Sequence, residues 1–480
     1  MNDKDNNYVL KLSHVILSKI IGFLNKNIDK ICFSLVCKQL YQQRDKYIFL
    51  NCDNIPQRYS NSIDNEYPRF QLNSYKNLLK RALELKSNCS LLITYTDQPD
   101  EKNNYDYIIV ISDFKELEIP STVKKLEFHY LFPHDLDSKF KSKLERSNVN
   151  QITLDSRRIL FDRFPSNIKD SLLVDSNQTL QLEIQSLPPN LQELRCVSTF
   201  ILHCTLRSLP STLRKLSISF QSLKSSIREN LPASLTELSV VFSNDDVIDC
   251  NNYIPLHISK LILITSKQHL TKGFIPSGVR KLEISRSVSL EIDIFSELNR
   301  LETLDLSRIS SYEGRIGRLP SNLKRMALLG CKYDPDIFIF PENRLDYLQI
   351  GDFSKTIRSD MLPLCKELVC SFGCDIESLP DGVETLALLS YHLFQWKDLP
   401  SSLRTLTITK KTLQMIGGAE GIPSNITNIR LLQSVNRNKY FLRRLNDQQF
   451  LLCGSAKYQT NGSGAIINQS DLLDFSLKIK

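Results

Sequence analysis

The stretch "LPSTLRKLSISF", residues 209–220, decides the fold because it recurs along the chain. It joins a Leu-Pro pair to apolar residues three, six and eight positions after the proline, namely Leu213, Leu216 and Ile218. Written as [LIF]-P-x-x-[LIV]-x-x-L-x-[LIVF], the pattern returns in segments 119–128, 187–196, 231–240, 254–263, 275–284, 319–328, 379–388, 399–408 and 422–431. A motif that recurs in this way indicates a stacked array of equivalent units.

Weaker copies fill the gaps between these segments. Residues 145–154 and 297–306 lack the proline, residues 340–350 carry one extra residue, and the runs beginning "FPSN" and "LPLC" are out of register. The proline slots at 188, 210, 232, 255 and 276 are 21 to 23 residues apart, which is the spacing of leucine-rich repeats. The sequence therefore predicts an α+β repeat solenoid, a curved stack of parallel strands with about fourteen rungs of about 22 residues each.

The pattern also predicts which side chains stack. Leu216 and Ile218 alternate with Lys215, Ser217 and Ser219, so the first two should point into the stack and the others outward. Proline cannot donate to a strand ladder and belongs just before the strand. The rungs resemble leucine-rich repeats, and the FNIP-repeat family in particular, over residues 119–431. The chain lacks the Phe-Asn-x-Pro tetrapeptide of that family.

An amphipathic segment precedes the array at residues 8–50. Its apolar residues recur at helical spacing, Ser13 is a candidate cap for the first helix, and Asp29 is a candidate cap for the second. It resembles the F-box, with Ser13 and Leu40 where that family has Pro and Trp. The matching residues are Leu12, Ile16, Leu17, Ile20, Ile21, Leu24, Asp29, Val36, Cys37, Lys38 and Leu40.

The F-box resemblance implies a docking surface for a Skp-type adaptor of cullin-RING (SCF-type) ubiquitin ligases. The residues expected to bind the adaptor are Leu12, Ile16, Ile20, Leu24, Val36 and Leu40. The alternative is that the helices only cap the solenoid, as repeat arrays require. About forty residues bury too little surface to be stable alone, so both interpretations need packing against a partner or the adjoining chain.

Two further segments complete the organisation. Residues 51–118 are expected to form a connecting and N-terminal capping unit, with a helix at 73–88 and strands in "SLLITYT" and "YDYIIVIS". Residues 432–480 are expected to form a C-terminal cap and tail, with strand-like runs in 439–460.

Composition restricts the class of protein. The 480 residues are 41% hydrophobic and 24% charged with a net charge of +8, which permits an acidic partner without requiring nucleic acid. No apolar run is long enough to span a membrane, and the mixed charges near the N-terminus argue against a signal peptide. The 12 cysteines suggest a reducing compartment, so we expect the cytoplasm, or alternatively the nucleus.

Catalytic and metal-binding motifs are missing from the sequence. There is no HExxH, P-loop, GxSxG or GxGxxG after a strand, and the Gly-rich "IGGAEG" precedes a rung and reads as a loop. Cys365, Cys370 and Cys374 lack zinc-knuckle spacing, and His129 is a surface candidate only. We therefore expect no enzymatic activity, cofactor, metal, small-molecule substrate, nucleic acid or membrane partner.

The remaining candidate site is the concave face of the strands, at positions five, seven and nine after each proline. A target protein is expected there, and apolar members break the polar pattern of a solvated strand. The partner-binding candidates are Lys215, Ser217, Ser219, Val241, Ile262, Ile264, Glu283, Arg325, Ala327, Leu329, Ala387 and Leu389. A discontinuous basic stripe at positions four and five, interrupted by Glu193, Glu237 and Glu302, would suit an acidic or phosphorylated partner.

These observations predict a substrate-recognition subunit of a ubiquitin ligase that binds the adaptor through its N-terminal helices and a target through the repeats. The alternative is a repeat scaffold without a ligase link.

Overall fold

The computed structural model describes residues 9, 12–24, 27–50, 72–78, 81–82, 90–94, 105–110, 118–128, 142–143, 146–154, 180–181, 190–196, 202–203, 209–225, 231–249, 253–313, 315–329, 338–351, 356–371, 375–432, 438–456 and 463–472. The predictions for Cys374, His129, the "FPSN" repeat copy and the last residues of the tail lie outside them. The chain divides into two compact units. Unit 1 comprises Met1–Asn88, Ser354–Leu362 and Lys366–Lys480, and unit 2 comprises Cys89–Phe353 and Pro363–Cys365.

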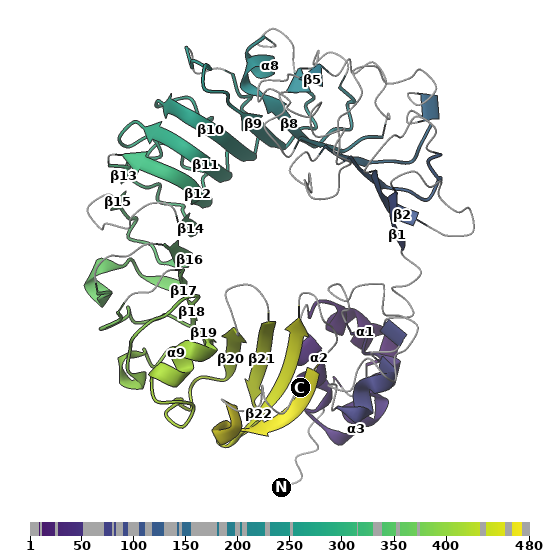
Figure 1. The fold of residues 1–480 in the computed structure, drawn as a ribbon, viewed down its shortest axis with the longest axis vertical. Coiled ribbons are helices and arrows are strands. Elements are labelled where there is room, and N and C mark those ends of the chain that lie inside the picture. The colour runs from purple at the N-terminus through teal and green to yellow at the C-terminus, as the bar shows by residue number, and fades with distance from the viewer. Residues whose placement is uncertain are drawn as a thin grey trace, which may run out of the picture. The chain divides into compact units, whose positions relative to one another are not determined.

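Unit 2 is a leucine-rich-repeat-like parallel solenoid, which confirms the predicted fold class (Figure 1). Each strand hydrogen-bonds to the next one along the chain in parallel. In order they are β1 (Ser90–Thr94), β2 (Tyr105–Val110), β3 (Lys125–Phe128), β4 (Gln151–Leu154), β6 (Glu193–Cys196), β8 (Lys215–Ser219), β9 (Glu237–Val241), β10 (Lys260–Leu270), β11 (Lys281–Leu290), β12 (Thr303–Glu313), β14 (Arg325–Leu328) and β16 (Leu345–Ile350).

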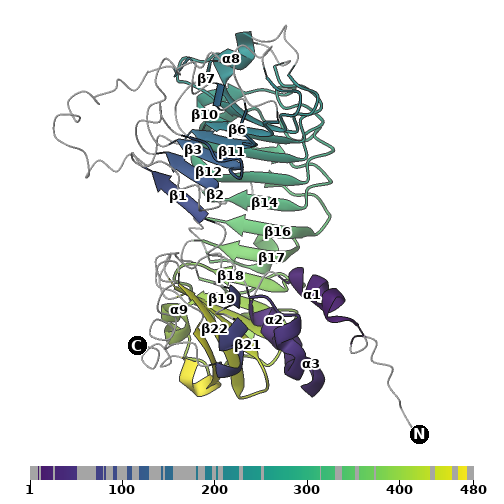
Figure 2. The same cartoon turned by 90° about the vertical axis from the view of Figure 1, so that its right-hand side faces the viewer.

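Short elements connect these strands. Helix α8 (Phe220–Ser225) follows β8 directly, and two small parallel sheets pair β5 (Leu180–Gln181) with β7 (Leu202–His203) and β13 (Gly317–Arg318) with β15 (Phe338–Ile339). The strands β8 to β12 lie side by side in chain order in Figure 1, and Figure 2 shows the same order for β10, β11 and β12. The number of turns in the solenoid differs slightly from the fourteen rungs that the sequence predicts.

The repeat motif has the predicted geometry. Leu213, Leu216 and Ile218 are buried, and β8 begins at the fifth residue after Pro210. The proline does not enter the strand, because its carbonyl accepts the Leu213 N–H at 3.0 Å and so closes a turn before it. The proline therefore begins the turn that immediately precedes the strand.

A polar position inside the motif joins successive rungs. Two residues after the proline, Thr212 Oγ1 donates to the Leu191 carbonyl at 2.9 Å, and Ser234 Oγ donates to the Leu213 carbonyl at 2.7 Å. Ser402 makes the same bond to Val383 in unit 1 at 2.9 Å. Gly278 holds the equivalent place, and a Cβ there would lie 1.9 Å from the Leu256 carbonyl oxygen. In these rungs the position holds either a hydroxyl side chain that bonds to the preceding rung or a glycine.

Unit 1 contains the last repeats and ends in an antiparallel meander. Its parallel strands are β17 (Cys365–Cys370), β18 (Thr385–Leu388), β19 (Thr405–Thr409) and β20 (Asn428–Leu432), and α9 (Lys410–Met415) follows β19. The first residue of β17, Cys365, belongs to unit 2 and the rest of the strand to unit 1. Three antiparallel strands follow, β21 (Asn438–Arg444), β22 (Gln449–Ala456) and β23 (Ser463–Asn468), and then the short helix η10 (Gln469–Leu472). The strand-like runs expected at 439–460 are thus observed.

The N-terminal helices belong to the same unit. They are α1 (His14–Gly22), α2 (Asn27–Ser34) and α3 (Lys38–Gln43), followed by η2 (Arg44–Lys46) and η4 (Asn73–Tyr75). Ser13 caps α1 as expected, since its Oγ accepts the Ile16 N–H at 3.4 Å. The cap predicted at Asp29 is wrong, because α2 already begins at Asn27 and Asp29 lies within its first turn.

Candidate interaction surfaces

The outward strand face, formed by positions five, seven and nine of each rung, is less exposed than the alternating pattern predicts. Arg325 is exposed, and Lys215, Ile262, Ile264, Glu283, Leu329 and Leu389 are partly exposed. The exposure expected for Ser217, Ser219, Val241, Ala327 and Ala387 is wrong, because all five are buried. Adjacent strands lie only about 4.8 Å apart, so larger neighbours cover small side chains between them.

The charged residues on this face form an alternating column. Lys215 Nζ lies 3.4 Å from Glu193 Oε2 and 3.8 Å from Glu237 Oε2. Lys260 Nζ lies 2.7 Å from the other oxygen of Glu237. Parallel pairing in register places these residues on neighbouring strands. The column therefore neutralises most of its own charge, with largely buried glutamates beside half-exposed lysines.

A second column one residue earlier behaves in the same way. Glu302 lies between two cations, 2.8 Å from Arg280 Nη1 and 3.9 Å from Lys324 Nζ. Arg325 stacks over the Tyr347 ring at 4.3 Å. Lys215, Arg280 and Lys324 of the basic stripe expected from the sequence are thus paired with the glutamates that interrupt it. Lys281 is exposed, its strand neighbours in register are Lys260 and Thr303, and no carboxylate of the described residues is within ion-pair distance of it.

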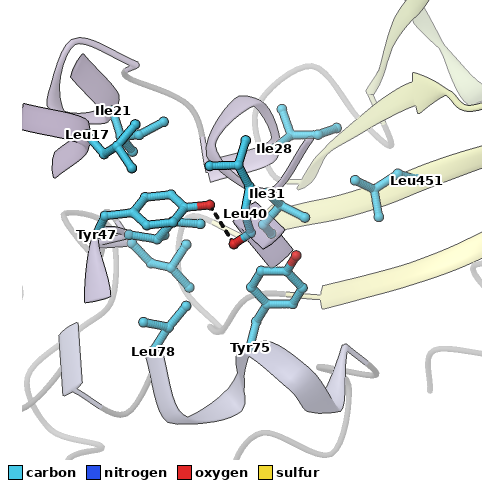
Figure 3. Close-up of a cluster of buried hydrophobic side chains, with 11 residues drawn as sticks. Leu17, Ile21, Ile28, Ile31, Leu40, Tyr47, Tyr75, Leu78 and Leu451 are labelled. Atoms are coloured by element: carbon cyan, nitrogen blue, oxygen red, sulfur yellow. Dashed lines mark hydrogen bonds between the residues drawn. The ribbon is translucent and has the colours of Figure 1, made fainter. Parts of the chain in front are cut away.

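Helix α1 carries two apolar faces. Leu17 and Ile21 are 2% and 1% exposed and lie in a buried cluster with Ile28, Ile31 and other residues of the helical segment (Figure 3). Ile16, Ile20 and Phe23 lie on the other face and are 46%, 41% and 84% exposed. A helix with a stripe of large apolar side chains in solvent is typical of a binding surface.

The other residues predicted to bind an adaptor divide between interior and surface. Val36 is exposed in the turn after α2. Leu12 and Leu24 are half-buried against the cluster. Leu40 is buried inside the cluster, so its expected contact with an adaptor is wrong. Its position in the F-box pattern is a core position in this chain.

The cluster extends well beyond residues 8–50. Tyr75 and Leu78, from the helical stretch that begins at residue 73, are buried in it, and so is Leu451 of β22. Phe441 of β21 packs against its edge, and Arg443 Nη2 lies 3.6 Å from Asp29 Oδ1. Figures 1 and 2 both show α2 against this meander. The adjoining chain thus supplies the packing that the helices need.

Two buried tyrosines give the cluster its polar connections. Tyr47 Oη donates to the Leu40 carbonyl at 2.9 Å, and the Tyr75 hydroxyl lies 2.6 Å from Ser34 Oγ. Burial raises the pKa of both phenols above the ordinary value, with Ser34 and Arg44 opposing the shift at Tyr75. Arg44 also donates from Nε to the Ser74 carbonyl at 2.9 Å, which links Ser74 to η2, directly after α3.

At the end of the parallel strands, the side chain of Arg444 forms backbone hydrogen bonds of the kind that a further rung would form. The guanidinium donates to the carbonyls of Ile426 at 3.1 Å, Pro423 at 3.3 Å and Ile422 at 3.4 Å. Its guanidinium carbon Cζ lies over the Phe450 ring, 4.7 Å from the ring centre. Burial lowers the pKa of Arg444, which nevertheless stays charged. The sequence offers one signal for it, the doubled arginine that follows the last repeat.

The described residues include free cysteines but no group of His, Cys, Asp and Glu side chains arranged to hold a metal ion. Cys365 and Cys370 are buried free thiols, and burial raises the pKa of Cys365 to about 12, so this thiol is not an activated nucleophile. None of the helices described is long and apolar enough to cross a membrane.

No family model and no curated protein matches the chain. Among solved structures it is similar to CroV588, described as a novel circular leucine-rich-repeat (LRR) protein, with a TM-score of 0.37 and 18% identity. The match covers 72% of this chain and 56% of that one, so this chain spans little more than half of that protein's length.

Proposed function

We propose that the protein is a non-enzymatic substrate receptor of a cullin-RING ubiquitin ligase. The N-terminal helices bind a Skp-type adaptor, and the outward strand face of the repeats binds the target protein. One observation carries the proposal. Helix α1 lies in a segment with F-box-like sequence and leaves Ile16, Ile20 and Phe23 in solvent after its other face has packed.

The target surface follows from the residues that stay accessible. Ile262, Ile264 and Leu329 are partly exposed apolar residues on the outward strand face, and Arg325 and Lys281 are exposed cations on the same face. This combination suits a target segment with apolar side chains next to carboxylates or phosphates. The alternating columns of paired charges contribute register and specificity more than affinity.

Adaptor binding is tested on the full-length chain, because the helices share their core with β22. In a pull-down and a titration with a purified Skp-type adaptor, we expect the double variant Ile16→Asp/Ile20→Asp to bind at least about tenfold more weakly than the original chain. Ile292→Asp, another exposed isoleucine, is the matched control and should bind normally. If the original chain shows no binding, or if the double variant binds equally well, the ligase proposal is wrong.

A second candidate function is a repeat scaffold in which the helices only complete the fold. The packing of Leu451 and Phe441 against the helices favours it, because a structural cap needs such a contact. In that case the double variant would change neither adaptor binding nor any other partner, while substitutions on the outward strand face would still abolish target capture.

A further inference from the structure

The last strand of the meander has an open edge. Strand β23 pairs antiparallel with β22 through residues 463–468, and no other strand of the described residues pairs with its opposite side. The N–H and C=O groups along that side are available to another strand. Sheet edges of this kind are the sites at which strands of other chains are added.

The residues of β23 do not protect this edge. Its sequence, Ser-Gly-Ala-Ile-Ile-Asn, contains neither proline nor a charged side chain. Proteins commonly prevent strand addition with a lysine, a proline or a bulge at an edge. By contrast, β21 lies inside the meander and carries Lys439, Arg443 and Arg444. The charged side chains of β21 therefore lie on a strand that is paired on both sides, whereas β23, the edge strand, is neutral.

Ile466 is the exposed apolar side chain of this edge strand. It is 57% exposed and stands opposite Leu451 of β22, which is buried in the cluster with the helices. Ala465 is buried, and Ile467, its neighbour on the same side of the strand, is partly exposed. The edge thus presents an apolar residue on one face and an apolar pair on the other.

We propose that β23 is a homodimer interface, in which the same strand of a second copy of this chain adds to the edge in antiparallel orientation. The antiparallel order continues that of β20 to β23. A two-fold axis perpendicular to the sheet at Ile466 keeps the two faces of the sheet in register, since residues an even number apart share a face. Ile466 then meets Ile466 of the other copy.

The sequence of β23 is complementary to itself in this register. Ala465 stands opposite Ile467 of the second copy, and Gly464 stands opposite Asn468, so each small residue faces a larger one. The two Ile466 side chains become a cross-strand apolar pair, and no like charges are opposed. These matches favour a second copy over an unrelated peptide. The proposal is independent of adaptor binding.

The mass of the full-length chain in solution tests the interface. By size-exclusion chromatography with light scattering, we expect the original chain to approach twice 55.3 kDa as its concentration rises. Ile466→Lys places two cations together at the two-fold axis and should leave a monomer, whereas Ile292→Lys should dimerise normally. An original chain that stays monomeric at every concentration, or an Ile466→Lys variant that still dimerises, overturns the proposal.

Cross-linking tests the register and does not rely on weakened folding. Ile466→Cys places a thiol on the axis opposite its own copy, within the Cα separation that a disulfide accepts. After mild oxidation, a non-reducing gel should show a covalent dimer for Ile466→Cys and none for Ile292→Cys or the original chain. Equal cross-linking of all three would show that other cysteines are responsible and that this register is wrong.

Discussion

The middle rungs of the solenoid and its C-terminal end satisfy their backbone groups in different ways. Within unit 2, each rung is completed by the next one, as when Arg214 and Lys215 both donate their N–H groups to the Gln192 carbonyl at 2.8 and 3.0 Å. At the end of unit 1 no further parallel rung follows β20 in the described chain, and one side chain, Arg444, serves three carbonyls. Backbone hydrogen bonds between equivalent rungs stabilise the middle of the solenoid, whereas a residue with no equivalent in other rungs stabilises its end.

The largest expected effect comes from removing that arginine. Arg444→Ala removes a donor from three carbonyls, of which, among the described residues, only that of Pro423 keeps a backbone donor, the Ile426 N–H, and we expect the free energy of unfolding of unit 1 to fall by about 2–3 kcal/mol. Urea unfolding followed by circular dichroism measures it. Arg404→Ala, which removes an exposed arginine bound to the carbonyl of Ser401, is the control and should change little. Equal effects of the two substitutions would remove the distinction between end and middle.

A glycine in the middle rungs should be nearly as sensitive. Gly278→Ala would place a Cβ 1.9 Å from the Leu256 carbonyl oxygen, so the two rungs must separate. We expect a loss of about 1–3 kcal/mol in the free energy of unfolding. Gly22→Ala in α1 meets nothing within 4 Å and serves as the control. An unchanged urea midpoint for Gly278→Ala would show that the rungs tolerate wider spacing.

The tyrosines of the helical cluster should make unit 1 sensitive to alkaline pH. The pKa of Tyr47 and that of Tyr75 are raised in the folded chain, so these phenols ionise first in the unfolded chain. Their contribution is therefore complete below about pH 10, the unfolded pKa, and is lost as the pH rises above it. We expect Tyr47→Phe to cost about 1 kcal/mol at neutral pH and to reduce the alkaline loss.

The exposed Tyr391→Phe is the control for this pH series, because its hydroxyl lies outside the cluster. Urea midpoints measured from pH 8 to about pH 11 would separate the two variants. A Tyr47→Phe curve parallel to that of the original chain would contradict the assignment.

The smallest effect is expected at the ion pair between the helices and the meander. Asp29 and Arg443 are both partly exposed and lie 3.6 Å apart. Asp29→Asn should lower the free energy of unfolding by less than about 1 kcal/mol and should matter less at high salt. A larger loss, measured by urea unfolding at two salt concentrations, would show that this pair and not Leu451 holds the helices to the meander.

The repeat core was predictable because its signal is local. Leu213, Leu216 and Ile218 lie within six residues of one another, and their spacing alone specifies turn, strand and interior. The hydrogen bond from the second residue after the proline is not predicted by the sequence, although Thr212 and Ser234 occupy that place in their repeats. Their acceptors belong to the preceding rung, and only the stacked structure reveals them.

The candidate surfaces were less predictable for a related reason. Alternation predicts that Ser217 and Ala327 are exposed on the outward side, but both are buried, because exposure depends on the neighbouring strands, which the residue's own segment does not contain. Leu40 fits the F-box pattern and yet is buried, because a family pattern does not separate core from contact positions. The contact between the helices and Leu451 joins residues too distant in sequence for any periodicity to indicate.

The shared core of the helices and β22 has a consequence for synthesis. Of the described residues, Ala82 is the last helical one packed at the cluster, and Phe441 is the first one of the meander to contact it. At about 5–20 residues per second, a ribosome needs about 20–70 s to pass from one to the other. For that interval Leu17, Ile21 and Ile31 have no β22 to pack against, although the repeats can already stack as they emerge. The nascent helices are therefore a natural substrate for chaperones until the meander leaves the ribosome.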